Sequence, residues 1–344
     1  MKRRRELTRR EFIGGLGGTA IGLAAGTSVF GGRPSFAQGV KAAEFEKKEW
    51  IIGFSNASET NTWRTALREA IEAEVKKHKN MKLFITDAND SPAKQVSDLE
   101  DLLAKKANGL IIGAATTDVA NPILDRCEKD GIPVVIVDRK VNSEKYTTFV
   151  SSDNNFMATK ALGKLIELIG DKGKIAIVQG IPGAGPAVER NAAYDALLKK
   201  HPNVKAVQQA GDWSRASGQR VIENIITANR DLAGIHFDGG EMALGGIQAL
   251  RAAGITDDMM KAGKPFLTWM DGYNGGLKMI KAGLGKYTIL HPPRLHGSDS
   301  VKALVMYFKG EKVPKKWPLK NPEITAANIN QYVAMDKPDD YWAL

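Results

Sequence analysis

Short, uninterrupted apolar runs alternate along this chain with longer segments whose apolar residues recur at helical spacing. Residues 110–112 and 134–137 are wholly apolar, which is the pattern of a strand buried on both faces. Strands that alternate with helices of this length form right-handed βαβ units. The alternation therefore predicts α/β architecture, with parallel sheets covered by helices on both sides.

This alternation occurs twice. The first series of strands is expected at 50–55, 82–86, 109–114, 133–138 and 147–151, and the second at 174–179, 204–210, 234–237, 266–270 and 287–290. Two halves of about 130 residues each fit two domains better than one small core. We therefore expect two similar doubly wound lobes, each built on a parallel sheet, with a ligand cleft between them.

Residues 1–37 have the three parts of an export signal. A basic stretch precedes the pair Arg9-Arg10, a glycine-rich apolar stretch follows, and Ser35-Phe36-Ala37 has the small-x-small pattern that a signal peptidase cuts. A retained membrane helix is the alternative, but its glycines make this stretch less apolar than a spanning helix of about 20 residues requires. We expect a twin-arginine signal cleaved near Ala37, a solvated leader at 38–48, and a soluble protein in the periplasm.

Charge and cysteine content narrow the choice of function. The formal net charge is +10, but residues 1–37 hold seven basic and two acidic residues, so half of the excess belongs to the signal. The remaining charges are interspersed without a basic stripe, which argues against a nucleic-acid partner. Cys127 is the one cysteine, so no intrachain disulfide and no cysteine metal site can form. Its amphipathic surroundings predict a buried thiol.

Polar and aromatic side chains follow the expected strands, at the point where each strand ends. Ligands of open parallel sheets bind beyond the carboxyl ends of the strands, so these side chains are candidates for a binding site. They are Asn61, Trp63, Arg64, Asp138, Arg139, Arg190, Trp213, Asp238, Asp271 and His291. Carboxylates accept from hydroxyl groups, guanidinium groups donate to oxygen atoms, and an indole packs on the apolar face of a sugar ring. The set predicts a polyhydroxylated ligand.

Each of these residues alone has a purely structural alternative. An aspartate at a strand end is as often the N-cap of the next helix. Trp63 alone fits a core position, and Arg190 alone fits a surface position. Such residues recur just beyond the carboxyl ends of several strands, and this recurrence favours a role in ligand binding over a structural one.

The sequence gives little support for other chemistry. The loop at 180–185 is rich in glycine, but it departs from G-x-G-x-x-G and contains Pro182, so it does not predict a dinucleotide site. The chain has neither a G-x-x-x-x-G-K-[ST] loop nor a G-x-S-x-G elbow. His291 and His296 are close in sequence, but two histidines without a third ligand do not make a metal site. We expect no cofactor, no metal and no catalytic residue.

From about residue 50 to 332, the chain resembles periplasmic sugar-binding proteins of the ribose-, galactose- and galactofuranose-binding type. The motifs that carry this resemblance are Asn61-Thr62-Trp63-Arg64, Asp138-Arg139, Glu189-Arg190, Asp212-Trp213, Glu241-Met242-Ala243-Leu244-Gly245 and Asp271-Gly272. Members of this family feed ABC importers and catalyse no reaction. The resemblance implies a solute-binding protein for a sugar or polyol, which acts as a monomer and docks on a membrane permease.

The resemblance also implies a type 1 periplasmic binding protein fold with three hinge strands. One lobe would comprise 49–151 and about 292–322, and the other about 152–291 and 323–344. Trp63 and Trp213 would stack on the two faces of the sugar, and a further set of residues would bind its hydroxyl groups. That set is Arg64, Asp138, Arg139, Arg190 and Asp271.

Two departures from the family leave the ligand open. Gly239-Gly240 stand where the family usually has Asn-Asp, so either the site is enlarged or Asp238 replaces the missing amide. His291 stands where the family has glutamine. If the imidazole of His291 lines the cleft, we expect affinity to change between about pH 5 and pH 8.

Three other classes of protein remain as alternatives. A periplasmic sensory protein would present the same ligand to a receptor, and sequence alone cannot distinguish it from a transport protein. An exported enzyme is disfavoured by the missing dinucleotide and metal motifs. A sugar-responsive repressor would need an N-terminal helix-turn-helix where the export signal stands.

Overall fold

The computed structural model describes residues 42–343, so the export signal expected at 1–37 lies outside the described part of the chain. The first described element is the short helix α1 (Ala42–Phe45). Its last residue, Phe45, is fully buried and stacks on Trp50 with ring centroids 5.9 Å apart. Part of the stretch expected to be solvated therefore belongs to the core, because this large apolar side chain finds an aromatic partner.

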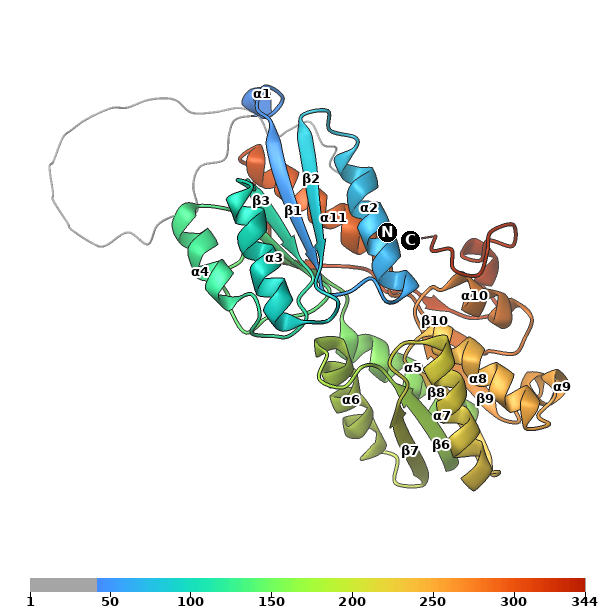
Figure 1. Cartoon of the computed structure of the whole chain (residues 1–344). Coiled ribbons are helices and arrows are strands. Elements are labelled where there is room, and N and C mark those ends of the chain that lie inside the picture. Colours follow the sequence, from blue (N-terminus) through green and yellow to red (C-terminus); the bar gives the residue numbers. More distant parts are fainter. Residues whose placement is uncertain (1–41, 344) are drawn as a thin grey trace, which may run out of the picture. The chain divides into compact units, whose positions relative to one another are not determined.

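The first sheet has six strands in the order β11-β5-β4-β3-β1-β2, and all neighbouring strands are parallel. These strands are β1 (Trp50–Asn56), β2 (Met81–Asp87), β3 (Gly109–Ile112), β4 (Val134–Val137), β5 (Thr148–Ser151) and β11 (Lys316–Pro318). The helices that cover its two faces are α2 (Thr62–Val75) with α11 (Pro293–Phe308), and α3 (Pro92–Ala104) with α4 (Asn121–Asp130) (Figure 1). Ile111 packs with the first pair, and Leu110 and Ile112 pack with the second.

The second sheet repeats this arrangement with the order β12-β10-β9-β8-β6-β7, in which β12 alone is antiparallel to its neighbour. Its strands are β6 (Gly173–Gln179), β7 (Val204–Ala210), β8 (Leu232–Phe237), β9 (Phe266–Met270), β10 (Tyr287–Ile289) and β12 (Glu323–Ile324). Its helices are α5 (Asn154–Leu168) and α6 (Gly185–Leu198) on one face, and α7 (Arg215–Ala228), α8 (Gly240–Ala252) and α10 (Asn274–Lys281) on the other (Figure 1). The two doubly wound lobes predicted from the sequence are confirmed.

Several short elements were not predicted. They are α9 (Asp257–Lys261), β11, β12 and a 3₁₀ turn at Ile329–Gln331. None of them is long enough to show an apolar period of its own. Among residues 42–343, no helix combines the length and the apolar character needed to cross a bilayer.

Cys127 is buried in α4, as its amphipathic surroundings predicted. Burial, together with the nearby Asp130, raises the pKa of its thiol to about 12. The thiol therefore stays protonated at neutral pH and serves as a small apolar side chain.

The chain passes between the two sheets three times. The passages are residues 152–153 between β5 and α5, 290–292 between β10 and α11, and 319–322 between β11 and β12. We call these three passages the hinge segments. The side-chain amide of Asn321 joins them, because its Nδ2 donates to Ser152 Oγ and to the Leu290 carbonyl oxygen, both at 2.8 Å.

Candidate functional site

One pocket collects all ten side chains that the sequence analysis selected. The empty space within it is about 560 Å³, including the part open to solvent. The residues that line it are Asn61, Trp63, Arg64, Asp138, Arg139, Pro186, Arg190, Trp213, Asp238, Gly239, Glu241, Asp271, His291 and Trp342. They come from both lobes and from a hinge segment, mostly from positions just beyond the carboxyl ends of strands.

The first lobe contributes a buried ion pair. Asn61 caps α2 by accepting from the backbone N–H of Arg64 at 3.0 Å, which fixes the first turn of the helix. Arg64 Nη2 then lies 2.6 Å from Asp138 Oδ2, and both side chains are almost fully buried. Burial acts to raise the pKa of Asp138, but Arg64, with His291 and His296, outweighs it and holds that pKa well below its usual range.

Of the three arginine side chains in the pocket, Arg139 has the weakest contacts with acceptor groups. Its guanidinium has long contacts to two backbone carbonyls, at 3.4 and 3.5 Å, and lies 3.9 Å from the half-exposed Asp90. Burial, and then the nearby Arg64, lower the pKa of Arg139 to about 10. This side chain is therefore charged at neutral pH and has donor capacity left for a ligand oxygen.

His291 lies in the second hinge segment, and Trp63 contacts it in two ways. Trp63 stacks on its ring with centroids 4.8 Å apart and donates from Nε1 to its carbonyl oxygen at 3.0 Å. One face of the Trp63 indole is thus covered by His291, and the guanidinium carbon of Arg64 lies 5.1 Å from the centroid of the same indole. Burial lowers the pKa of His291, with Arg190 and Arg64 acting the same way against Asp138, so its titration lies below the ordinary value near 6.5.

Asp138, His291 and His296 bring three metal-ligating atoms within 4.8 Å of one another. A third candidate ligand, which the sequence did not reveal, therefore lies beside the two histidines. The neighbouring charges nevertheless disfavour a cation. Arg64 Nη2 lies 2.6 Å from the other carboxylate oxygen of Asp138, and Arg190 Nη2 lies 3.5 Å from His291 Nδ1, so two guanidinium groups would repel a metal ion here. His291 Nε2 and Asp138 Oδ1 lie 3.4 Å apart, which is too far for a good hydrogen bond between them.

The second lobe contributes a buried network around Arg190 and Asp238. Arg190 Nε donates to Asn154 Oδ1 at 2.9 Å, and its Nη1 lies 3.9 Å from Asp238 Oδ2. The hydroxyl of Tyr194 donates to Asp238 Oδ1 at 2.5 Å and contacts His236 Nε2 at 3.0 Å. Burial raises the pKa of Asp238 against the pull of Arg190 and Tyr194.

This network bears on the replacement of Asn-Asp by Gly239-Gly240. Both carboxylate oxygens of Asp238 already accept within the protein, from Tyr194 and from the backbone N–H of Gly180 at 3.2 Å. Asp238 lines the pocket, but its main partners are protein groups. Asp238 therefore has little capacity left to replace the missing amide. The space beside the two glycines is filled by Asp271, whose carboxylate would lie 3.2 Å from a Cβ on Gly239 and 2.8 Å from a Cβ on Gly240.

Trp213 packs so closely that it requires a glycine beneath it. A Cβ atom on Gly180 would lie 2.2 Å from the Trp213 ring. Trp213 also has a left-handed backbone, with φ of 53°, which is rare for a bulky residue. Asp138 and Asp271 share this feature, with φ of 63° and 81°. Backbone strain thus gathers at the pocket, as it often does at functional sites.

Asp271 both lines the pocket and organises the backbone around it. Its carboxylate accepts from the N–H groups of Gly240 at 2.8 Å and Tyr273 at 2.9 Å. A Cβ on Gly240 would lie 2.8 Å from this carboxylate, so the glycine permits the contact. Burial raises the pKa of Asp271 to about 7 and the nearby Glu241 acts in the same direction, although both N–H groups oppose the shift.

We expect the carboxyl group of Asp271 to titrate near pH 7. Carbon-13 chemical shifts of the aspartate carboxyls measure this, and Asp271→Asn identifies the signal. An unfolded aspartate titrates near 3.9, so the folded protein retains this proton over a range where the unfolded chain has lost it. The stability that this group contributes is complete below about pH 4 and is lost as the pH rises through 7. A midpoint at or below 4 would contradict the assignment, and the exposed Asp257 is the control.

Several buried polar atoms of the pocket have no hydrogen-bond partner among the described residues. They are Arg64 Nη1, Asp138 Oδ1, Arg139 Nε, Trp213 Nε1 and His291 Nε2. Leaving such an atom unpaired costs about 1–3 kcal/mol, and the cost is larger for charged groups. A ligand whose groups both donate and accept can satisfy this mixed set.

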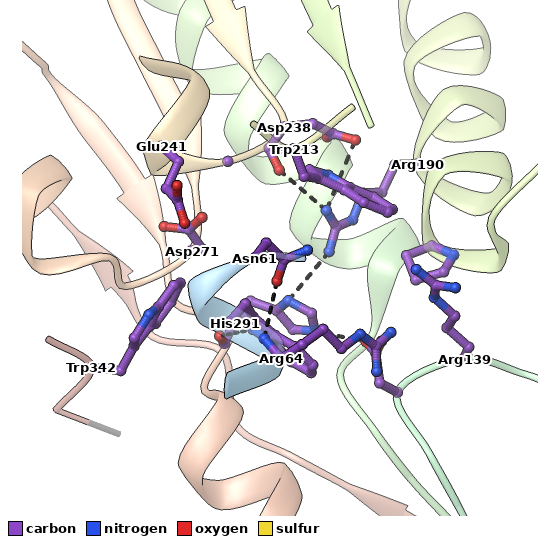
Figure 2. A pocket seen from close by; sticks show the side chains of 14 residues that line it. Asn61, Arg64, Arg139, Arg190, Trp213, Asp238, Glu241, Asp271, His291 and Trp342 are labelled. Atoms are coloured by element: carbon purple, nitrogen blue, oxygen red, sulfur yellow. Dashed lines mark hydrogen bonds and ion pairs between the residues drawn. The ribbon is translucent and has the colours of Figure 1, made fainter. Parts of the chain in front are cut away.

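Glu241 and Trp342 line the pocket as well, but neither was predicted from the sequence. Figure 2 shows both near Asp271, on the opposite side of the pocket from Arg139. Glu241 follows β8 within a motif quoted above, so its position was a usable signal. Trp342 lies close to the C-terminus, far from any predicted strand end, and carried no such signal.

Comparisons with known proteins agree with this architecture. The sequence model of the family described as periplasmic binding protein domain matches residues 52–312. The ribose import binding protein of Bacillus subtilis is 30% identical over 269 residues, which cover 78% of this chain and 85% of that protein. The galactofuranose-binding protein of Escherichia coli is 27% identical, over 77% of this chain and 84% of that protein.

Solved structures give the same result. An ABC transporter solute-binding protein of Mycobacterium smegmatis with bound glycerol superposes with a TM-score of 0.75 at 28% identity. The superposition covers 83% of this chain and 98% of the other. A galactofuranose-binding protein superposes with a TM-score of 0.77, over 85% of this chain and all of the other, but at 22% identity it supports the fold alone.

Proposed function

This chain belongs to the periplasmic binding protein family of type 1 sugar-binding proteins, and from that premise we propose how it works as the solute-binding component of an ABC importer. Its ligand is a sugar or polyol, which it captures in the pocket between the lobes and delivers to a membrane permease. The observation that carries this proposal is the set of unpaired polar atoms beside indole rings in one pocket. A relative named for ribose import favours transport over sensing.

The ligand would bind one lobe first, and the other lobe would then close over it. Closure follows because only the closed state uses contacts from both lobes. Asp138 Oδ1 and the free donors of Arg64 and Arg139 would bind hydroxyl groups from the first lobe. Arg190 and Asp271 would do so from the second lobe, with Trp63 and Trp213 against the faces of the ring.

The cellular setting is part of the proposal. Residues 1–37 would direct export through the twin-arginine route and be removed near Ala37. The mature protein would act as a periplasmic monomer, with lobes at 49–151 plus about 292–322 and at about 152–291 plus 323–344. Its closed form would dock on the permease, and it would catalyse no reaction.

Tryptophan fluorescence of the mature protein tests the function directly. Pentoses, hexoses, furanose sugars and polyols would each be titrated, and we expect a saturable change at micromolar concentration with at least one of them. Trp317→Phe is the control, because Trp317 packs in the first lobe outside the pocket, so this variant should keep the response. No response from any compound, together with unchanged melting temperatures, would refute a sugar or polyol ligand.

A further inference from the structure

The C-terminal segment 332–343, which we call the strap, lies outside the part of the chain that the family model matches. It nevertheless contributes Trp342 to the pocket. Trp342 is 2% exposed, so it is as well buried as a core residue although it lies near the end of the chain. The strap is therefore an ordered part of the site that the family domain alone does not supply.

Two side chains of α10 hold the strap in place. Lys278 Nζ donates to the Lys337 carbonyl oxygen at 2.7 Å and pairs with Asp339 at 3.0 Å. Asn274, at the start of α10, donates from Nδ2 to the carbonyl oxygens of Ala334 and Pro338, both at 2.9 Å. Its Oδ1 accepts from the N–H of Ala334 at 3.0 Å. Asn274 is 1% exposed and does not line the pocket, so its role is to position the strap.

The end of the strap contacts the first lobe. Trp342 Nε1 donates to Thr62 Oγ1 of α2 at 3.2 Å, and Arg294 Nε of α11 donates to the Trp342 carbonyl oxygen at 2.5 Å. From the second lobe, Tyr273 packs edge-on against the indole with ring centroids 5.7 Å apart. Thr62 also donates to Glu241 of α8, at 2.5 Å. Trp342 thus contacts both lobes at the side of the pocket where Glu241 lies.

We propose that the strap completes the ligand site, with Trp342 as the outer wall of the pocket and as a contact that holds the lobes closed there. This rests on the proposed function, because it assigns a size limit to the same sugar or polyol pocket. An indole at this position gives the ligand apolar surface to pack on and blocks any substituent that points outward. The strap would therefore set how large a ligand this chain accepts.

Binding calorimetry on three variants tests whether Trp342 limits the size of the ligand. Trp342→Ala should raise Kd at least tenfold for the compound that saturates the wild-type protein. The methyl glycoside or methyl ether of that compound should lose much less affinity, or gain some, because the variant has room for it. Asn274→Ala should show the same change in selectivity without altering the wall residue. Met335→Ala, at an exposed strap position, should match the wild type.

Two results would contradict the proposal that Trp342 forms the outer wall of the pocket. One is an unchanged Kd in Trp342→Ala, and the other is an equal loss for the parent compound and its methylated derivative. Small-angle X-ray scattering without ligand tests the contact between lobes independently. The radius of gyration should increase in Trp342→Ala and Asn274→Ala and stay unchanged in Met335→Ala, and no increase would refute that contact. If no sugar or polyol binds the wild type, both the proposed function and the role of Trp342 in limiting ligand size are refuted. The scattering experiment would still test whether Trp342 holds the lobes together.

Discussion

Replacing Asp138 by Asn should lower the free energy of unfolding by about 3–5 kcal/mol and abolish ligand binding, the largest effect we expect of a single substitution. The cost arises because Arg64 would keep its charge, almost fully buried and without its partner at 2.6 Å. Urea unfolding measures the stability, and fluorescence titration measures the binding. The difference between the two proteins should shrink as the pH falls below about 4, because the contribution of a carboxyl with a lowered pKa is lost in acid.

Two further variants separate the ion pair from other effects. The double variant Asp138→Leu/Arg64→Met removes both charges, so it should recover much of the lost stability without restoring binding. Asp257→Asn removes the partner of Arg251 at the surface and should change stability by less than about 1 kcal/mol. If Asp138→Asn loses no more stability than Asp257→Asn, the buried pair is not the strong structural element described here.

Gly180→Ala should weaken ligand binding at least tenfold, or about 1.4 kcal/mol, while leaving most of the stability intact. The new methyl group would lie 2.2 Å from the Trp213 ring, so the indole must leave its position in the pocket. Binding calorimetry measures the loss, and a crystal structure of the variant would show the displaced ring.

A second glycine, five residues later at the start of α6, provides the control. A Cβ on Gly185 would meet its nearest neighbour, the backbone nitrogen of Lys140, at 3.8 Å, which is ordinary contact. Gly185→Ala should therefore bind as the wild type does. Native affinity in Gly180→Ala would mean that Trp213 does not contact the ligand.

The lobes and the ten selected side chains were accessible to prediction for one physical reason. Parallel strands bring their carboxyl ends to the same edge of a sheet, so side chains as distant as Trp63 and His291 gather in one pocket. The burial of Cys127 was predicted from the same apolar periodicity. These are consequences of topology, and topology can be recognised in the order of apolar runs.

Other features depend on contacts that no local pattern encodes. The third atom beside His291 and His296 comes from Asp138, more than 150 residues earlier in the chain. Trp342 reaches the pocket through a strap without a strand or a long helix. Asp271 was weighed as either a cap or a ligand group, and the structure shows it accepting backbone N–H groups while also lining the pocket.

The amide of Asn321 has a mechanical consequence. By joining Ser152 and Leu290 to its own segment, it makes three separate stretches of backbone bend together. We therefore expect the three hinge segments to move together when the lobes rotate, which limits sliding of one lobe past the other. His291 directly follows Leu290 in one of the joined segments, so we expect it to be displaced less than the pocket residues that lie farther from the hinge segments.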